Sequence, residues 1–265
     1  MRALYVDLDG TLFGPGASLL RDAGGAFSLD GVRALQACDR AGVEVVIFSG
    51  RRQSSVFEAA RTIGSSAYIF EIGCGLVLDG ELEWLTDGLE PREGASIFDQ
   101  ISATGAPALL LERYAGRLEY HTPWHIGREV SHLFRGVLDT AEANELVAAQ
   151  GLRLIDNGVI HERVGDASVV HVYHLIPAGA SKARGVARHM QARGYDRADC
   201  IAVGDSREDL EAADVVGTFW LVANAPERDP SLRDEIAGRA GVRLAEGAYG
   251  AGVYEAVVTT LAEHR

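Results

Sequence analysis

The first third of the chain alternates apolar, strand-like runs with amphipathic helical stretches, and this alternation restricts the fold more than any other feature. Residues Ala3 to Val6 are typical of a strand, Leu29 to Ala41 of a helix, and Val43 to Phe48 of a second, β-branched strand. A helix over Gln53 to Ile63 and a strand over Ala67 to Ile72 continue the series. Strands and helices that alternate at this interval predict βαβ units around a parallel sheet.

The last third of the chain has the same alternation of strand-like and helical segments. It predicts a helix over Lys182 to Arg193, a short strand over Cys200 to Val203 and a short helix over Arg207 to Ala213. One or two strand segments follow between Val215 and Val222, and a helix over Gly252 to Ala262 ends the series. We therefore expect this part to complete the core begun by the first third.

The middle of the chain has a different pattern. Leu76 to Glu83 predicts a β-hairpin around Asp79-Gly80, and Asp156-Asn157-Gly158 predicts a second hairpin turn. Thr140 to Gln150 predicts a helix with Thr140 as its N-cap. Further short strands are expected at residues 109–111, 117–121, 152–155, 159–163 and 169–175. This pattern is typical of an antiparallel sheet with a few helices.

The order of these regions predicts the domain organisation. We expect an α/β fold, with a Rossmann-like parallel-sheet core and an inserted α+β cap domain. The boundaries are placed near residues 80 and 177, with Pro177-Ala178-Gly179 as the exit hinge. The core would then comprise residues 1–80 and 178–265, and the cap residues 81–177.

The charge balance restricts the partners. The 265 residues include 38 acidic and 25 basic side chains, for a formal net charge of −13. Such a surface repels nucleic acid backbones and anionic membranes. We therefore expect neither as a partner, and a small molecule as the substrate. The oligomeric state is left open.

The cysteines and the apolar runs indicate the compartment. Cys38, Cys74 and Cys200 are far apart in apolar surroundings, which predicts buried, reduced thiols. No apolar run approaches membrane-spanning length, and no signal-like segment precedes the first strand. A cytoplasmic protein is expected.

Two aspartates interrupt the first strand where it ends. Asp7 and Asp9 are two residues apart, so their side chains point to the same side. Ligands of open parallel sheets bind beyond the carboxyl ends of the strands. Because paired carboxylates repel each other there, a cation is expected between or beside them. Mg²⁺ suits the position, since it binds through one or two carboxylates together with substrate phosphate.

Other predicted strand ends and loops carry matching groups. Ser49-Gly50 follows the second strand, and Asp205 follows the strand at Cys200, with Asp209 four residues later. Lys182 begins a helix. These groups supply metal ligands, a hydroxyl and backbone amides for phosphoryl oxygens, and an ammonium for the remaining charge. Phosphoryl transfer depends mainly on such positioning and charge neutralisation.

Four motifs in order carry a family resemblance: DLDGT at Asp7, FSGR with Ser49, GASKARGV with Lys182, and GDSREDLEAAD with Asp205 and Asp209. With them the chain resembles the phosphatases of the haloacid dehalogenase superfamily. The insertion between the second and third motifs resembles the cap subclass of the Cof-type, sucrose-phosphate, trehalose-phosphate and mannosyl-3-phosphoglycerate phosphatases.

The resemblance implies a role for each matching residue. Asp7 would be the nucleophile that forms an aspartyl-phosphate, and Asp9 the acid that protonates the leaving oxygen and then activates water. The implied phosphate-binding residues are Ser49, Gly50 and Lys182. The implied Mg²⁺ ligands are the Asp7 carboxylate, the Asp9 backbone carbonyl, Asp205 and Asp209. Thr11 and Arg51 are second-rank members of the site.

The resemblance also implies the activity. We expect a Mg²⁺-dependent phosphatase of a sugar phosphate or a phosphoglycerate-type metabolite, with mannosyl-3-phosphoglycerate as the nearest named example. A phosphomutase on the same core and a non-catalytic, metabolite-binding regulatory protein are the alternatives. Candidate substrate contacts are Arg51, Arg113, His125, Arg128 and His174. A zinc site at His121 and His125 is disfavoured, because Pro123 opposes the helix that this spacing needs.

Overall fold

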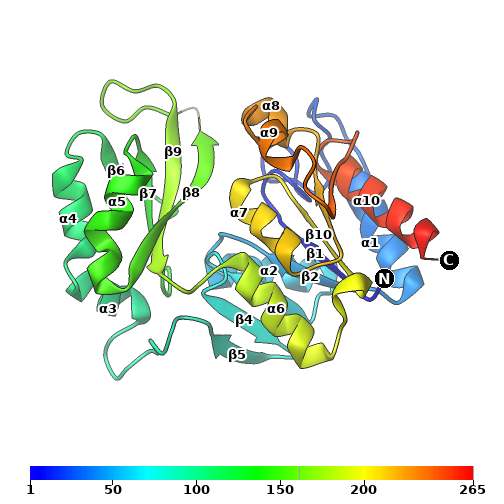
Figure 1. Cartoon of the computed structure of the whole chain (residues 1–265), viewed down its shortest axis with the longest axis horizontal. Helices are drawn as coiled ribbons and strands as arrows, with labels where there is room; N and C mark the ends of the chain where they lie inside the picture. Colours follow the sequence, from blue (N-terminus) through cyan, green and yellow to red (C-terminus); the bar gives the residue numbers. More distant parts are fainter. Residues whose placement is uncertain (161, 265) are drawn as a thin grey trace.

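The computed structural model describes residues 1–160 and 162–264, and it contains two separate sheets. An eight-stranded sheet forms the core and a four-stranded sheet forms the cap; the two lie beside each other, with the cap at the left in Figure 1. Both chain termini lie on the far side of the core from the cap (Figure 1).

The core sheet is mostly parallel. Its strand order is β12-β11-β10-β1-β2-β3-β4-β5, parallel from β12 to β3, with β4 and β5 added antiparallel at one edge. Its strands are β1 Ala3–Val6, β2 Glu44–Phe48, β3 Ala67–Phe70, β4 Gly75–Leu78, β5 Glu81–Trp84, β10 Cys200–Gly204, β11 Thr218–Leu221 and β12 Val242–Leu244. The central strands β1 and β10 are buried at every position, as expected for strands covered on both faces.

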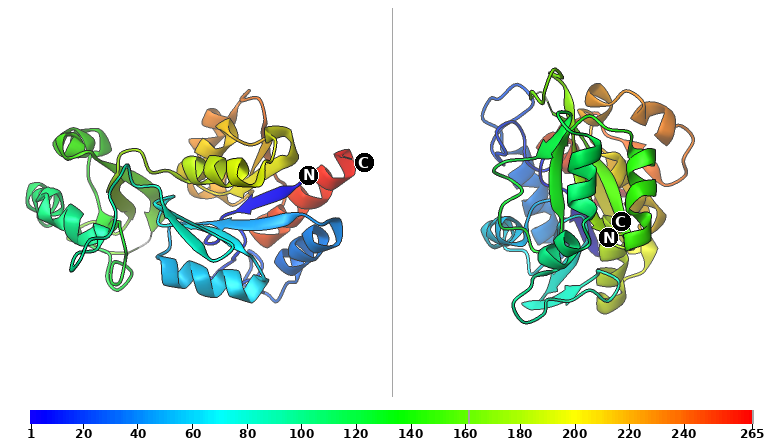
Figure 2. Two further views of the ribbon diagram at one scale, coloured as in Figure 1. Left: turned by 90° about the horizontal axis from the view of Figure 1, so that it is seen from below. Right: turned by 90° about the vertical axis from the view of Figure 1, so that its left-hand side faces the viewer.

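Helices cover both faces of this sheet. One face carries α1 Asp30–Ala41, α2 Gln53–Ile63 and α10 Gly250–Glu263, and the other carries α6 Lys182–Arg193 (Figure 2). The remaining core helices are the short α7 Arg207–Leu210, α8 Ala225–Arg228 and α9 Leu232–Ile236. Gly42, Gly64 and Gly194 end three of the long helices in left-handed conformation.

The cap is a two-layer unit. Its antiparallel sheet has the order β6-β7-β9-β8, with β6 Leu118–Tyr120, β7 His132–Gly136, β8 Leu152–Ile160 and β9 Val170–Pro177. Helices α3 Ile97–Ala103, α4 Ala106–Arg113 and α5 Thr140–Val147 cover the sheet face that points away from the core (Figure 1). The other face of the sheet is turned toward the core. The predicted fold class is confirmed.

The three leucines at residues 109–111 form part of a helix, so the strand predicted there is wrong. They lie in α4, which has a proline in its first turn; Leu110 is buried and Leu109 is exposed. A short apolar run does not separate a strand from the buried face of a helix. The sequence pattern also missed β7 and α3.

The hairpin predicted at Asp156-Asn157-Gly158 is also wrong. The chain runs through these residues as one strand, β8, with a bulge between Asp156 and Val159. The Asp156 side chain accepts a hydrogen bond from Gly158 N at 2.9 Å, a local turn-like contact within the strand. The strand predicted over 159–163 continues only to Ile160, and residue 161 lies outside the described residues. The α5 N-cap is Asp139 rather than Thr140.

The core sheet extends past the first predicted domain boundary. The boundary between residues 80 and 81 falls in the turn of the β4–β5 hairpin, and β5 pairs within the core sheet. We therefore propose that the cap begins after Trp84 and returns to the core after Pro177, where β9 ends.

Cys38, Cys74 and Cys200 are buried and free, as predicted. Within residues 1–160 and 162–264, none of the helices has both the length and the apolar character needed to cross a membrane.

Candidate active site

The central strands bring the predicted site together at one edge of the core sheet. Val6 of β1 is paired with Val203 of β10 and Ile47 of β2, so the residues that follow these strands are neighbours. Asp7 N donates to Val203 O at 3.1 Å, and Ser49 N donates to Ile69 O at 2.9 Å. The carboxyl ends of parallel strands thus place groups from distant parts of the sequence side by side.

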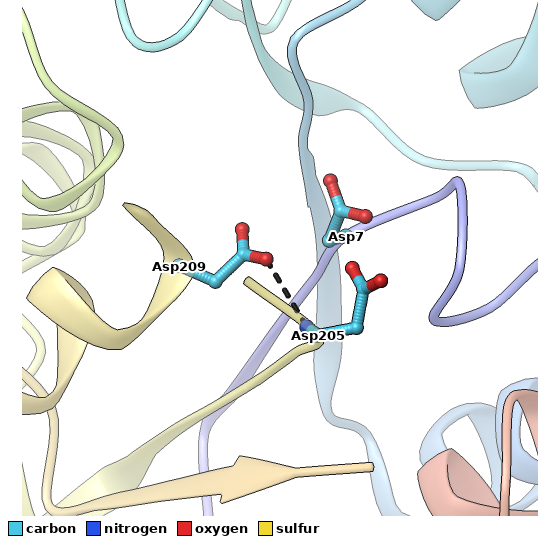
Figure 3. Close-up of side chains that lie close together, drawn as sticks. All are labelled: Asp7, Asp205 and Asp209. Atoms are coloured by element: carbon cyan, nitrogen blue, oxygen red, sulfur yellow. Dashed lines mark hydrogen bonds between the residues drawn. The ribbon is translucent and has the colours of Figure 1, made fainter. Parts of the chain in front are cut away.

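Three aspartates form a buried cluster at this edge (Figure 3). Each of Asp7, Asp205 and Asp209 offers an oxygen within 4.8 Å of the oxygens of the other two. Asp209 lies in the first turn of α7, where its Oδ2 accepts from Asp205 N at 3.1 Å and from Ser206 N at 3.0 Å. Ser206 Oγ in turn accepts from Asp209 N, which completes a capping box. Asp209 therefore fixes the loop that carries Asp205.

The turn after Asp9 packs directly against Asp205. Gly10 has φ +90°, and a Cβ atom there would lie 2.2 Å from Asp205 Oδ2, so this position requires glycine. Thr11 Oγ1 donates to Asp205 Oδ1 at 3.2 Å. The glycine and threonine of the DLDGT motif therefore serve to hold the distal aspartate close to Asp7.

Two cations face the cluster. Lys182, which is 2% exposed, donates from Nζ to Asp7 Oδ1 at 2.9 Å and to Asp209 Oδ1 at 2.7 Å, and lies 3.4 Å from Glu208 Oε2. Arg228 at the end of α8 forms an ion pair with Asp205. Four buried carboxyl groups thus share two cations, so negative charge is in excess when all four are ionised.

The pKa shifts reflect this imbalance. Burial raises the pKa of Asp7 well above its usual value, even though the Lys182 ammonium opposes the shift. Burial also raises the pKa of Asp205 to about 6 and that of Glu208 to about 8. For Lys182 burial acts to lower the pKa, but the surrounding carboxylates outweigh it and raise the pKa well above the usual value.

The cluster fits a divalent cation. Its donors are carboxylate oxygens at close mutual distance, the ligand type that hard divalent cations take. A bound divalent ion would neutralise the charge of these carboxylates, which Lys182 and Arg228 balance only in part.

Asp9 lies apart from this cluster. Its carboxylate receives two hydrogen bonds from Arg51, from Nε and Nη2, each of 2.5 Å. The Asp9 side chain is about half exposed at the cavity wall. Arg51 therefore holds Asp9 in place, and fewer of its N–H groups are left to bind a substrate.

A cavity of about 560 Å³ opens between the core and the cap at this point. Most of the predicted site residues line it: Asp7, Asp9, Ser49, Gly50, Arg51, Arg128, His174, Lys182, Asp205 and Asp209. Residues from β7, β8 and β9 form the cap side of the same cavity.

Two predicted substrate contacts lie elsewhere. Arg113 is on α4, in the outer layer of the cap, where it is paired with Glu142. His125 stacks on Tyr120 with ring centroids 4.9 Å apart and is not among the lining residues. Neither placement agrees with a role in substrate contact.

Several residues at the site were not predicted from the sequence. Arg52, Trp124 and Arg228 line the cavity, and His121, which the sequence brought up only as a zinc ligand, lines it too. Glu208 is buried beside Lys182. Only Glu208 had a usable signal, since it lies one residue before Asp209 within the fourth motif. The others depend on contacts between distant segments.

Comparison with known proteins agrees with this geometry. The family model described as haloacid dehalogenase-like hydrolase matches residues 159–238. The chain belongs to the haloacid dehalogenase superfamily. This hydrolase is 26% identical over 239 residues to the phosphoglycolate phosphatase of Archaeoglobus fulgidus, covering 89% of each chain. It is also 26% identical over 264 residues to that of Methanothermobacter thermautotrophicus, covering 97% of each.

Solved structures share the whole architecture. Thermoplasma acidophilum 0175 superimposes with a TM-score of 0.69 at 17% identity, and the sucrose-phosphatase of Synechocystis, in complex with sucrose and phosphate, with 0.65 at 15%. Each match covers 98% of both chains. The predicted subclass, with its Cof-type and sucrose-phosphate phosphatases, and the predicted enzyme class, a phosphoric monoester hydrolase, are confirmed.

Proposed function

We propose that this phosphatase is Mg²⁺-dependent and hydrolyses a small phosphorylated carboxylic acid through an aspartyl-phosphate on Asp7. The observation that carries the proposal is the convergence of Asp7, Asp205 and Asp209 with Lys182 in one buried cluster at the cavity. Asp7, Asp205, Asp209 and the Asp9 backbone carbonyl would hold the metal. A bound Mg²⁺ supplies positive charge against the phosphoryl oxygens as the ester bond breaks.

In the first half-reaction an Asp7 carboxylate oxygen attacks phosphorus, and the bond between phosphorus and the ester oxygen breaks. Asp9 gives a proton to that oxygen, which leaves as an alcohol. For this step the Asp9 carboxyl group leaves Arg51 and turns toward the substrate, and it carries the proton that it took from water in the preceding turnover. Lys182 and Ser49 hold phosphoryl oxygens, the first by charge and the second through its hydroxyl group.

In the second half-reaction Asp9, now a carboxylate, takes a proton from a water molecule. The resulting hydroxide attacks phosphorus, and the bond from phosphorus to the Asp7 oxygen breaks. Inorganic phosphate leaves, and both aspartates return to their starting states. The cap over the cavity excludes other water, so the aspartyl-phosphate reacts only with the water that Asp9 activates.

The substrate class follows from the cap end of the cavity. The four acidic residues that line the cavity are all at its core end, whereas Arg52, His121, Arg128 and His174 lie toward the cap. Burial lowers the pKa of His121 and, more strongly, that of His174, so both imidazoles are neutral and can donate one hydrogen bond each. In each ring Nδ1 is buried and has no partner, so Nε2 is the nitrogen that a molecule in the cavity would contact. These groups suit a carboxylate carried by the substrate.

The names of the relatives support the same class, since several are phosphoglycolate phosphatases. Mannosyl-3-phosphoglycerate, the example that the sequence suggested, also carries a carboxylate. A sugar phosphate is the second candidate, favoured by the size of the cavity, about 560 Å³.

The test is phosphate release from matched substrates with Mg²⁺ or with EDTA. 2-Phosphoglycolate and 3-phosphoglycerate should be hydrolysed faster than ethyl phosphate and glucose 6-phosphate, and EDTA should abolish every rate. In Asp7→Asn turnover should be lost while the fold is kept. Unchanged phosphate release in that variant would exclude Asp7 as the nucleophile.

The same assay decides between the alternatives. A phosphomutase would return the phosphoryl group to a sugar phosphate and would need a bisphosphate activator, so it would isomerise the substrate with little free phosphate. A regulatory binding protein would bind 2-phosphoglycolate without any turnover.

A further inference from the structure

Glu71 is a buried acid of the core that the reaction does not use. It follows β3, is fully buried, and has φ +46°, and Ile72 after it has φ +59°. Left-handed backbone is unfavourable for residues with a Cβ atom, most of all for β-branched ones such as Ile72. Such a conformation persists where surrounding contacts impose it.

The Glu71 carboxylate is bound by the cap. Its Oε1 accepts from Glu129 N at 2.8 Å, and its Oε2 accepts from Val130 N at 3.2 Å and Ser131 N at 2.6 Å. Ser131 Oγ donates to the same Oε2 at 2.8 Å. Three successive backbone amides and one hydroxyl group of the cap therefore converge on one side chain of the core.

Arg128 carries this connection to the phosphate-binding loop. Its Nη1 and Nη2 donate to Gly50 O at 3.0 and 3.1 Å, and Nη1 also donates to Ser131 Oγ at 2.8 Å. Its Nε donates to Trp124 O at 3.1 Å. Four of the five guanidinium N–H groups are thereby engaged, which leaves one for a substrate.

The loop at Ser49 is held from the other side by the same core segment. Glu71 N donates to Arg51 O at 3.0 Å, and Ile72 N donates to Ser49 O at 3.2 Å. Arg52 Nη1 donates to Ile126 O at 2.6 Å, a further bond from this loop to the cap. The cap segment 126–131, the core turn at 71–72 and the loop 49–52 thus form one connected unit beside the cavity.

We propose that Glu71 is a positioning residue that fixes the cap segment 126–131 and, through Arg128, the Gly50 carbonyl of the phosphate-binding loop. In this view Arg128 also acts by positioning rather than as the substrate contact expected from the sequence. The unit fixes the position of the cap end of the cavity relative to the phosphate-binding loop.

The first test measures hydrogen exchange in wild type and Glu71→Gln. The amide group replaces one acceptor oxygen with a donor, so the amides of residues 129–131 lose acceptors and should exchange about tenfold faster. Peptides covering residues 49–52 should exchange faster as well, while those of β1 stay unchanged. Unaltered exchange in residues 129–131 would overturn the anchor. This readout does not require turnover.

The second test is kinetic, and it rests on the proposed function. Glu71→Gln should lower kcat/KM for both 2-phosphoglycolate and p-nitrophenyl phosphate by about 10- to 100-fold, because both use the phosphate-binding loop. Arg128→Lys should act through the same unit. The kcat/KM of the double variant should therefore be no more than about twofold lower than that of the worse single variant. Losses that multiply would overturn the proposal. An inactive wild type would instead count against the proposed function and leave the exchange test valid.

Matched controls separate positioning from general stability. Asn144→Ala removes two hydrogen bonds that join α5 to β8 inside the cap and one within α5, and it should leave kcat/KM unchanged in the folded protein. Ser131→Ala removes only one hydroxyl group from the unit and serves if Glu71→Gln does not fold. It should accelerate exchange at 49–52 severalfold, and no change there would equally overturn the proposal.

Discussion

The two ends of the cavity differ in charge and in origin. The core end has four aspartates, three on loops that follow parallel strands and Asp209 in α7, and burial raises the pKa of two of them, Asp7 and Asp205. The cap end has the neutral imidazoles of His121 and His174. A site that needs a divalent cation and a dianionic phosphoryl group explains the first set. Under the proposed function the second set would meet the carboxylate end of the substrate.

This difference in charge and origin predicts how substitutions at each end should affect catalysis. Changes at the core end alter the step that all substrates share, so they should lower every rate by a similar factor. Changes at the cap end alter recognition of the leaving group, so their effect should depend on the substrate.

The largest effect is expected at Lys182. Lys182→Met removes the cation from three buried carboxylates, Asp7, Glu208 and Asp209. In EDTA the variant should lose about 3–5 kcal/mol of stability, because a buried charge cluster is left unbalanced. With Mg²⁺ its kcat/KM should fall by about 10²- to 10³-fold for all substrates alike. Urea unfolding and assays on two substrates measure these changes.

Arg188→Met is the matched control for this variant. Arg188 is on the same helix, α6, but its side chain is partly exposed and forms an ion pair with Glu83. Exposed pairs of this kind contribute about 0–1 kcal/mol, so stability and activity should hardly change. A Lys182→Met loss confined to one substrate would contradict the division between the two ends.

The pH response should also separate core from cap. Burial lowers the pKa of His132 in β7 from 6.5 to about 4. The His132 imidazole is therefore protonated near pH 6.5 in the unfolded chain but only near pH 4 in the folded cap. Stability falls as the pH decreases through this interval, because the unfolded chain binds the additional proton. The cost reaches about 3 kcal/mol at pH 4. In the core the raised pKa values of Asp205, about 6, and Glu208, about 8, act in the opposite direction.

Hydrogen exchange in EDTA at pH 7.0 and pH 4.5 follows both regions at once. Between these values the folded core binds more protons than the unfolded chain, so β1 and β10 should keep their protection while β7 and β9 lose it. His132→Gln should remove the part of the loss in the cap that His132 causes, while His121 and His174, whose pKa values burial also lowers, cause the rest. Equal loss of protection in both sheets would contradict the assigned shifts.

The core could be predicted from the sequence because its information is local. Each strand end carries its functional residue within a few positions, and the rule that parallel strands align their carboxyl ends places Asp7, Ser49 and Asp205 together. The cap could be predicted only as a type of domain. Short apolar runs such as 109–111 suit either a strand or a buried helix face, and the bulge in β8 resembles a turn.

Residues that connect distant segments could not be predicted at all. Arg228 meets Asp205 across 23 positions, and Glu71 meets Ser131 across 60. Neither contact follows from periodicity, spacing or composition, since the first exists only after the core has folded and the second only after the core and the cap have packed together. The unassigned polar residues next to strand ends, such as Glu71 after β3, are the ones to inspect for such roles.

The smallest predicted effect is at the cap end. His174 is buried, lies at the cavity, and would be 3.3 Å from a Cβ atom placed on Gly50. His174→Leu should lower kcat/KM for 2-phosphoglycolate about tenfold, the value of one hydrogen bond to a charged group. For p-nitrophenyl phosphate, which has no carboxylate, the change should stay within about twofold. The ratio of the two kcat/KM values is the measurement.

Arg113→Ala provides the control that makes this ratio informative. Arg113 and His174 are both cap residues that the sequence proposed as substrate contacts, but Arg113 is paired with Glu142 in the outer layer. Its loss should leave the ratio at the wild-type value. If Arg113→Ala shifted the ratio as much as His174→Leu, position in the cavity would not decide selectivity. The contrast between the inner and outer faces of the cap would then have no functional meaning.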